Sequence, residues 1–167
     1  VWGFNDDSMG WKPSINIYSK KGNLWAKVFS ENLDPTMLVD KKYFTLRGQI
    51  IGTVDIKGSN NGVVVQQARQ GSGGFISYKV IAKENDTYKV IYESGDLKHG
   101  NIRIVGDFIE ENSDDPLPSD SNCCPTYIKY RHVSFSTGKP EFSDEFRENN
   151  YFLKFQDYYS KMLKEKQ

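Results

Sequence analysis

The chain has 167 residues and equal numbers of basic and acidic side chains, 22 of each, so its formal net charge is zero. This length favours a single domain over residues 1–167 with a sizeable core, and the 14% of aromatic residues supply much of the burial. The lack of a basic excess argues against a nucleic-acid partner, and no apolar run approaches the ~20 residues that a membrane span needs.

The compartment is indicated only by weak signals. The chain begins at Val1 rather than Met, which fits removal of a signal peptide. Tyr, Asn, Ser and Asp are plentiful while Ala is scarce, a composition compatible with an exported bacterial protein. We therefore expect an extracytoplasmic location: the periplasm, the cell surface or the medium.

The N-terminal third contains one clear hairpin. Residues 1–13 are aromatic but interrupted by Gly, Asp and Pro, which predicts an irregular lead-in to the β core. From Ser14 to Phe29 apolar and polar residues alternate on both sides of a Lys-Lys-Gly-Asn turn at 20–23. This pattern predicts two antiparallel strands.

Between residues 43 and 105 the hydrophobic pattern has a period of two almost throughout. Short stretches rich in β-branched and aromatic residues recur about every ten residues and are separated by Gly, Asn and Asp turns. The expected strands are Tyr43–Arg47, Gln49–Ile56, Gly62–Ala68, Phe75–Ala82, Tyr88–Ser94 and Asn101–Val105. The sequence therefore predicts a mainly β fold, an antiparallel sandwich or a curved meander sheet.

An acidic segment interrupts this pattern at residues 110–121, which contain five acidic residues, three serines and two prolines. We expect a long surface loop there. A further strand is predicted over Tyr127–Ser136, so the β core would extend over residues 14–136.

The period changes in the C-terminal tail. Phe152, Phe155, Tyr159 and Met162 recur at three- and four-residue steps. Asp144 suits a helix start and Lys164 a helix end, so we expect one amphipathic helix over about 144–164, which makes an α+β fold an alternative. This helix would pack on the sheet or contact a partner.

Cys123 and Cys124 are the most unusual pair in the chain. Consecutive Cα atoms lie about 3.8 Å apart, whereas disulfides span roughly 4.4–6.8 Å, so a bond between the two would be strained. Three interpretations stay open: two buried thiols, a vicinal disulfide that stiffens a turn, or a functional thiol pair. The spacings typical of zinc and thioredoxin sites are absent.

Catalytic patterns are weak. No G-x-S-x-G elbow or H-E-x-x-H motif occurs, and the only imidazoles are those of His99 and His132. The paired carboxylates, including Glu110-Glu111, are expected in polar settings that would not raise a carboxyl pKa. We therefore expect neither an enzyme nor a bound metal or cofactor.

One segment carries a resemblance. Asp120-Ser121-Asn122-Cys123-Cys124-Pro125-Thr126, preceded by Gly71–Phe75 and Ile91–Ser94, resembles the D-x-N-C-C-P-[ST] segment of exported bacterial β-proteins and small lipoproteins, such as a mycobacterial lipoprotein group. The resemblance covers roughly residues 62–135. It implies an extracytoplasmic β-rich protein, and it transfers no catalytic residue.

The sequence therefore predicts a non-catalytic module that binds a protein or a glycan, since Tyr-rich surfaces give contact area at low entropic cost. An inhibitor or immunity-type protein, whose acidic segment plugs a basic active site, is the alternative. A thiol-dependent redox protein is the third hypothesis. The expected binding residues are Gly71, Ser72, Gly73, Gly74, Asp114, Asp115, Asp120, Tyr127 and Tyr130.

Overall fold

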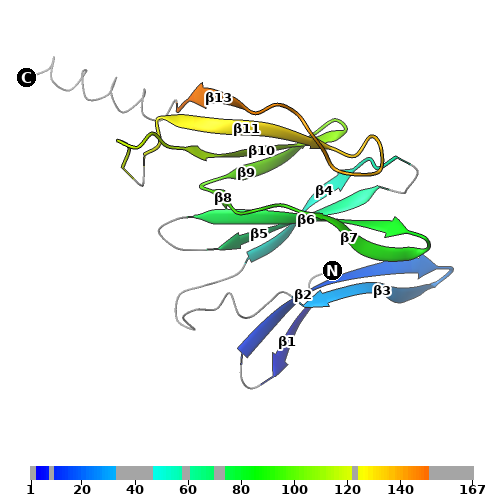
Figure 1. The fold of residues 1–167 in the computed structure, drawn as a ribbon. Coiled ribbons are helices and arrows are strands. Elements are labelled where there is room, and N and C mark those ends of the chain that lie inside the picture. Colours follow the sequence, from blue (N-terminus) through cyan, green and yellow to red (C-terminus); the bar gives the residue numbers. More distant parts are fainter. Residues whose placement is uncertain are drawn as a thin grey trace, which may run out of the picture.

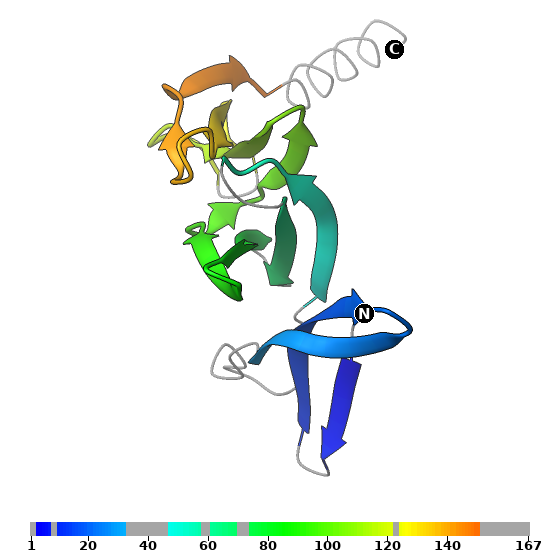
Figure 2. The same ribbon diagram turned by 90° about the vertical axis from the view of Figure 1, so that its right-hand side faces the viewer.

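The computed structural model describes residues 3–7, 10–32, 47–57, 61–69, 74–121 and 124–150. These ranges contain thirteen β-strands and no helix, and every pairing between the strands is antiparallel. The strands form three sheets that lie on one another as layers (Figures 1 and 2). The mainly β, antiparallel fold class predicted from residue alternation is thus confirmed. Within the described ranges, no helix could cross a membrane.

The N-terminal sheet has the strand order β1-β2-β3. Its strands are β1 (Gly3–Asp7), β2 (Gly10–Lys21) and β3 (Leu24–Asn32). β2 and β3 form the hairpin expected from the sequence, and its tight turn is possible because Gly22 adopts a φ of 59°. The irregular lead-in expected over residues 1–13 is wrong for the residues described there, because Gly3–Asp7 pair with residues 10–14 as strands of the sheet.

The central sheet has the order β4-β5-β6-β7, with β8 also paired to β6. Its strands are β4 (Arg47–Val54), β5 (Gly62–Arg69), β6 (Phe75–Glu84), β7 (Thr87–Glu93) and β8 (Leu97–Lys98). β4 to β7 agree with the predicted strands to within two residues at each end. β8 was not predicted, because residues 95–100 were expected to form a turn. The strand expected over Tyr43–Arg47 lies almost entirely outside the described residues.

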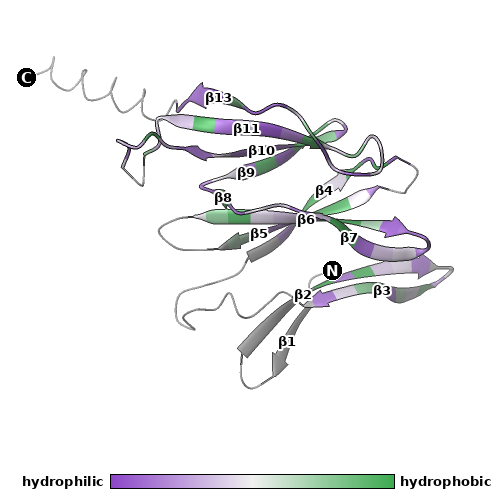
Figure 3. Ribbon diagram, in the orientation of Figure 1, coloured by the Kyte–Doolittle hydropathy of each residue, from purple (hydrophilic) through white to green (hydrophobic). Residues whose placement is uncertain are grey.

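The C-terminal sheet has the order β12-β11-β10-β9, and β13 pairs with β11. Its strands are β9 (Asn101–Val105), β10 (Phe108–Asp115), β11 (Tyr127–Ser134), β12 (Glu141–Phe142) and β13 (Phe146–Asn149). Figure 3 shows that β13 and much of β11 are hydrophilic, as expected for an outermost sheet.

Two sequence-based boundaries are corrected by this sheet. The acidic loop expected over 110–121 begins only at Pro116, because β10 continues to Asp115 and pairs with β11 over its full length. The helix expected over 144–164 does not begin at Asp144, because Phe146–Asn149 form a strand against Tyr127–Tyr130. Residues 151–164 lie outside the described residues.

The central sheet is buried on both of its faces. Toward the C-terminal sheet, Val64, Tyr78 and Val80 meet Ile109 and Phe135 in one core, and all five side chains are fully buried. Toward the N-terminal sheet, the buried residues among the side chains that the structure describes are Ile15, Val65 and Ile81. The central sheet therefore contributes to two cores, one on each face.

Candidate functional site on the outer face of the C-terminal sheet

The strand register shows which side chains share the outer face of the C-terminal sheet. Glu110 on β10 lies opposite His132 on β11, and Tyr130 on β11 lies opposite Phe146 on β13. Because side chains alternate along a strand, these residues point away from the central sheet, while their neighbour Ile109 is buried against it.

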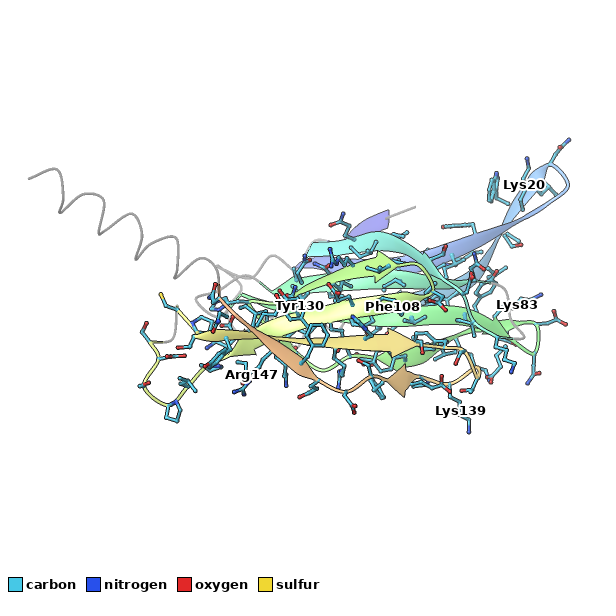
Figure 4. The ribbon with its side chains drawn as sticks, turned by 90° about the horizontal axis from the view of Figure 1, so that it is seen from above. Lys20, Lys83, Phe108, Tyr130, Lys139 and Arg147 are labelled. Atoms are coloured by element: carbon cyan, nitrogen blue, oxygen red, sulfur yellow. The ribbon has the colours of Figure 1, made fainter. Side chains whose placement is uncertain are left out.

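Four rings on this face form a continuous row, called here the aromatic row: Phe108, His132, Phe146 and Tyr130. The ring centroids of Phe108 and His132 are 4.3 Å apart, and those of His132 and Phe146 are 5.7 Å apart at an interplanar angle of 70°. Phe146 then stacks on Tyr130 at 5.2 Å and 10°. In Figure 4, which looks down on the outermost sheet, Phe108 and Tyr130 both lie along this face. The rings are thus ordered before any partner arrives.

Charged groups border the row on one side. Glu110 accepts hydrogen bonds from Arg103 Nε at 2.7 Å and from His132 Nε2 at 3.3 Å. The hydrogen bond from Arg103, reinforced by that from His132, holds the pKa of Glu110 below its usual range against the effect of desolvation. The Arg103 side chain is 67% exposed, so its guanidinium keeps donors available to a partner.

Of the residues predicted to bind, only Tyr130 belongs to the row. Tyr127 and Asp115 lie opposite each other in the register and share the parity of buried Ile109. Arg147 joins them, since its guanidinium lies 4.9 Å above the Tyr127 ring and bonds to Asp115 at 2.5 Å. They form a separate cluster on the inner side of the sheet.

The remaining predicted carboxylates have structural partners. Asp114, whose side chain is only 3% exposed, accepts a hydrogen bond from His99 Nδ1 at 2.6 Å. Asp120 closes the β10–β11 loop by accepting bonds from the backbone and hydroxyl of Thr126 and from Leu117 N. These bonds hold the pKa of Asp120 below its usual range, with the Thr126 backbone donor contributing most.

The glycine cluster is only partly described. Gly71, Ser72 and Gly73 lie outside the described residues. Gly74 has a φ of 46°, and its carbonyl accepts a 2.8 Å hydrogen bond from His99 N. A Cβ at this position would come within 2.9 Å of the His99 ring, so the local packing accounts for the glycine.

The two cysteines are also only partly described. Cys123 lies outside the described residues. Cys124 is partly exposed in the β10–β11 connection, and its backbone N–H donates to Ser121 O at 3.1 Å. The state of the thiol pair stays a prediction.

The expectation that Glu111 lies in a polar setting is wrong. Its side chain is buried between the central and C-terminal sheets and accepts a hydrogen bond from Tyr78 Oη at 2.6 Å. Tyr92 Oη donates to the same oxygen at 3.3 Å, and Arg131 donates to the other oxygen from two nitrogens, at 3.0 and 2.6 Å. Glu111 is two residues from the apolar Ile109 on the same strand, so the two side chains share a face. This spacing could have predicted that Glu111 is buried.

In this buried network, defined as Glu111, Tyr78, Tyr92 and Arg131, both carboxylate oxygens of Glu111 accept hydrogen bonds. Burial, followed by the charge of Glu111, raises the pKa of Tyr78 far above its usual value and that of Tyr92 to about 12. Neither phenol is therefore ionised at neutral pH. A hollow of about 200 Å³ beside Arg131 is lined by charged and polar residues, including the ion pair between Lys129 and Glu145.

Within the described ranges, no group of three or more His, Cys, Asp and Glu side chains is arranged to hold a metal ion. No protein-family model matches the chain, and neither the curated proteins nor the solved structures contain a match. Function must therefore be inferred from the geometry of the face itself.

Proposed function

We propose that the protein is a non-catalytic, extracytoplasmic binding module that holds its partner on the outer face of the C-terminal sheet. The observation that carries the proposal is the aromatic row, which supplies four adjoining rings from three strands. Aromatic and Arg side chains supply most of the energy of known interfaces, and both kinds occur here.

The geometry of the rings favours a protein partner over a glycan. Sugar rings pack against open aromatic faces, whereas Tyr130 and Phe146 already cover one face of each other at 10°. Phe146 is nevertheless 42% exposed, so apolar ring surface stays accessible at the centre of the row. Arg103 and Glu110 then provide the polar rim that protein interfaces have.

A binding role also fits the hydrogen bonds of the described side chains that could take part in catalysis, because each of them already has a partner within the protein. Both oxygens of Glu111 are occupied by donors, and the raised pKa of Tyr78 keeps its phenol neutral. His99 and His132 each bond to a carboxylate. These groups support the structure rather than a reaction.

The inhibitor hypothesis draws less support from the structure. It requires an acidic segment that is free to enter a basic active site. Asp114, Asp115 and Asp120 instead bond to His99, Arg147 and Thr126, in that order.

The proposal is tested by affinity capture from the extracytoplasmic fraction of the source cells, with a glycan array run in parallel. We compare the wild-type chain with Phe146→Ser, which opens the centre of the row. Loss of one interface anchor should weaken partner binding at least about tenfold. The matched control is Leu117→Ser, which removes an equally exposed apolar residue from the β10–β11 loop.

Both variants must first show an unchanged melting temperature, so that lost binding reports contact rather than unfolding. A captured protein that is retained by Leu117→Ser and released by Phe146→Ser supports the proposal. A partner that binds both variants equally, or a glycan bound independently of Phe146, would overturn it.

A further inference from the structure

The tip of the β2–β3 hairpin, residues 18–27, is chemically unlike the rest of this neutral protein. It contains three lysines and no acidic residue. Its apolar side chains are also unusually open: Leu24 is 77% exposed and Trp25 66%. Figure 4 shows Lys20 at the end of this hairpin, which lies to one side of the other strands.

Register brings lysines and aromatic rings together on one face of the hairpin. Lys20 lies opposite Trp25, and Tyr18 lies opposite Lys27. All four side chains are exposed. Among the described residues, neither Lys20 nor Lys27 forms an ion pair with a carboxylate.

The apolar surface continues from Trp25 toward the central sheet. A hollow of about 490 Å³ lies there, lined by Ile17, Tyr18, Trp25, Ile50 and Val63, with Asn16 as the polar member. Ile50 is itself exposed. Apolar surface, aromatic rings and positive charge are thus contiguous over one side of the N-terminal sheet.

We propose that the hairpin tip docks end-on on an anionic lipid surface. Leu24 and Trp25, which point to opposite faces of the hairpin, then both reach the headgroup boundary, and Lys20 and Lys27 lie against the headgroups. Trp is enriched at membrane–water interfaces, and lysines near a surface are attracted by anionic lipids. The tight turn at Gly22 orders the tip before it inserts.

The chemistry favours lipid over other occupants. A polyanionic glycan or nucleic acid would pair with the lysines but would leave the aliphatic Leu24 in water. A second copy of the chain would bring a tip of the same charge, which is repulsive. A surface with both negative headgroups and an apolar interior satisfies both kinds of side chain.

The experiment is co-flotation of the full chain with vesicles of phosphatidylcholine containing 30% phosphatidylglycerol, compared with pure phosphatidylcholine. We expect binding to the anionic vesicles alone, weakened by added salt. Replacing both Lys20 and Lys27 by Gln should lower the partition coefficient about 25-fold, at about fivefold for each lysine. Lys139→Gln, at an exposed turn of the C-terminal sheet, is the matched control and should change nothing.

A second variant separates insertion from simple charge attraction. Leu24→Ser with Trp25→Ser keeps all three lysines, and on this proposal it also loses binding by more than tenfold. Full binding by that variant, or equal binding to dextran sulfate beads, would show an electrostatic polyanion site and overturn the lipid assignment. Failure of the wild type to float with anionic vesicles would do the same. The aromatic row is not involved, so these outcomes are independent of the binding function proposed above.

Discussion

The two faces of the central sheet differ in how they are held to their neighbours. Among the described residues, eleven are buried in the core toward the C-terminal sheet, and the buried network crosses the same interface. Three of the described residues are buried toward the N-terminal sheet, beside an ion pair between Lys79 and Glu31. Because stability follows the apolar area removed from water, the first interface should define global unfolding and the second should open locally.

The largest expected effect tests the stronger interface directly. Glu111→Ala removes the acceptor shared by Tyr78, Tyr92 and Arg131 and leaves a guanidinium between the sheets without its carboxylate. Glu111 and Tyr78 are buried, whereas the Arg131 side chain is 30% exposed. The loss of unfolding free energy, measured by urea denaturation, should therefore be about 3–4 kcal/mol, and most of it should come from the buried groups left without their partner. Glu31→Ala is the control at the weaker interface and should cost about 1 kcal/mol. Equal losses would show that the two interfaces do not differ.

A matched pair of core truncations sharpens the comparison. Ile109→Ala should cost about 3 kcal/mol and speed amide exchange in both the central and C-terminal sheets. Ile15→Ala should speed exchange in β1–β3 while leaving the slowest amides of β10 and β11 unchanged. Hydrogen exchange read by mass spectrometry checks both, and uniform acceleration by Ile15→Ala would contradict local opening.

The alkaline limit of stability should come from the stronger interface. The pKa values of Tyr78 and Tyr92 are raised in the folded state, by burial first, so the unfolded chain ionises first as pH rises. The stabilisation is complete below about pH 10, and the part that Tyr92 contributes is lost as pH rises to about 12, whereas the part from Tyr78 is lost only at higher pH. Two pKa units correspond to about 2.7 kcal/mol for Tyr92, which its partial exposure to solvent reduces to about 1 kcal/mol. Tyr92→Phe should reduce the slope of the stability profile between pH 10 and 12, measured by thermal melting at each pH. An unchanged profile would mean that Tyr92 ionises normally in the fold.

The smallest expected effect lies outside both interfaces. Asp120→Asn replaces the carboxylate that closes the β10–β11 loop and should lower the melting temperature slightly at neutral pH. The folded pKa of Asp120 is lowered, so its contribution is present above the usual aspartate pKa and is lost as pH falls below about 4. The difference between wild type and variant should therefore vanish in acid. A difference that persists at pH 2 would assign the effect to altered loop packing.

Much of the strand pattern follows from the sequence alone. Alternation at Ile76, Tyr78 and Val80 identifies the buried side of β6 because side-chain direction reverses at every residue of a strand. The Gly22 turn is equally local, since it depends on a backbone angle that glycine favours. These features require no knowledge of what the strand packs against.

Other features were decided by tertiary structure. Residues 110–115 are acidic enough to resemble a loop, yet they form a strand whose carboxylates pair with arginines from elsewhere in the sheet. Arg103 and Arg131 lie on the two adjacent strands, and Arg147 lies on β13. The aromatic row joins rings from β10, β11 and β13, which no local pattern connects. Local alternation determines which residues share a face, whereas the long-range register of the sheets determines which residues meet there.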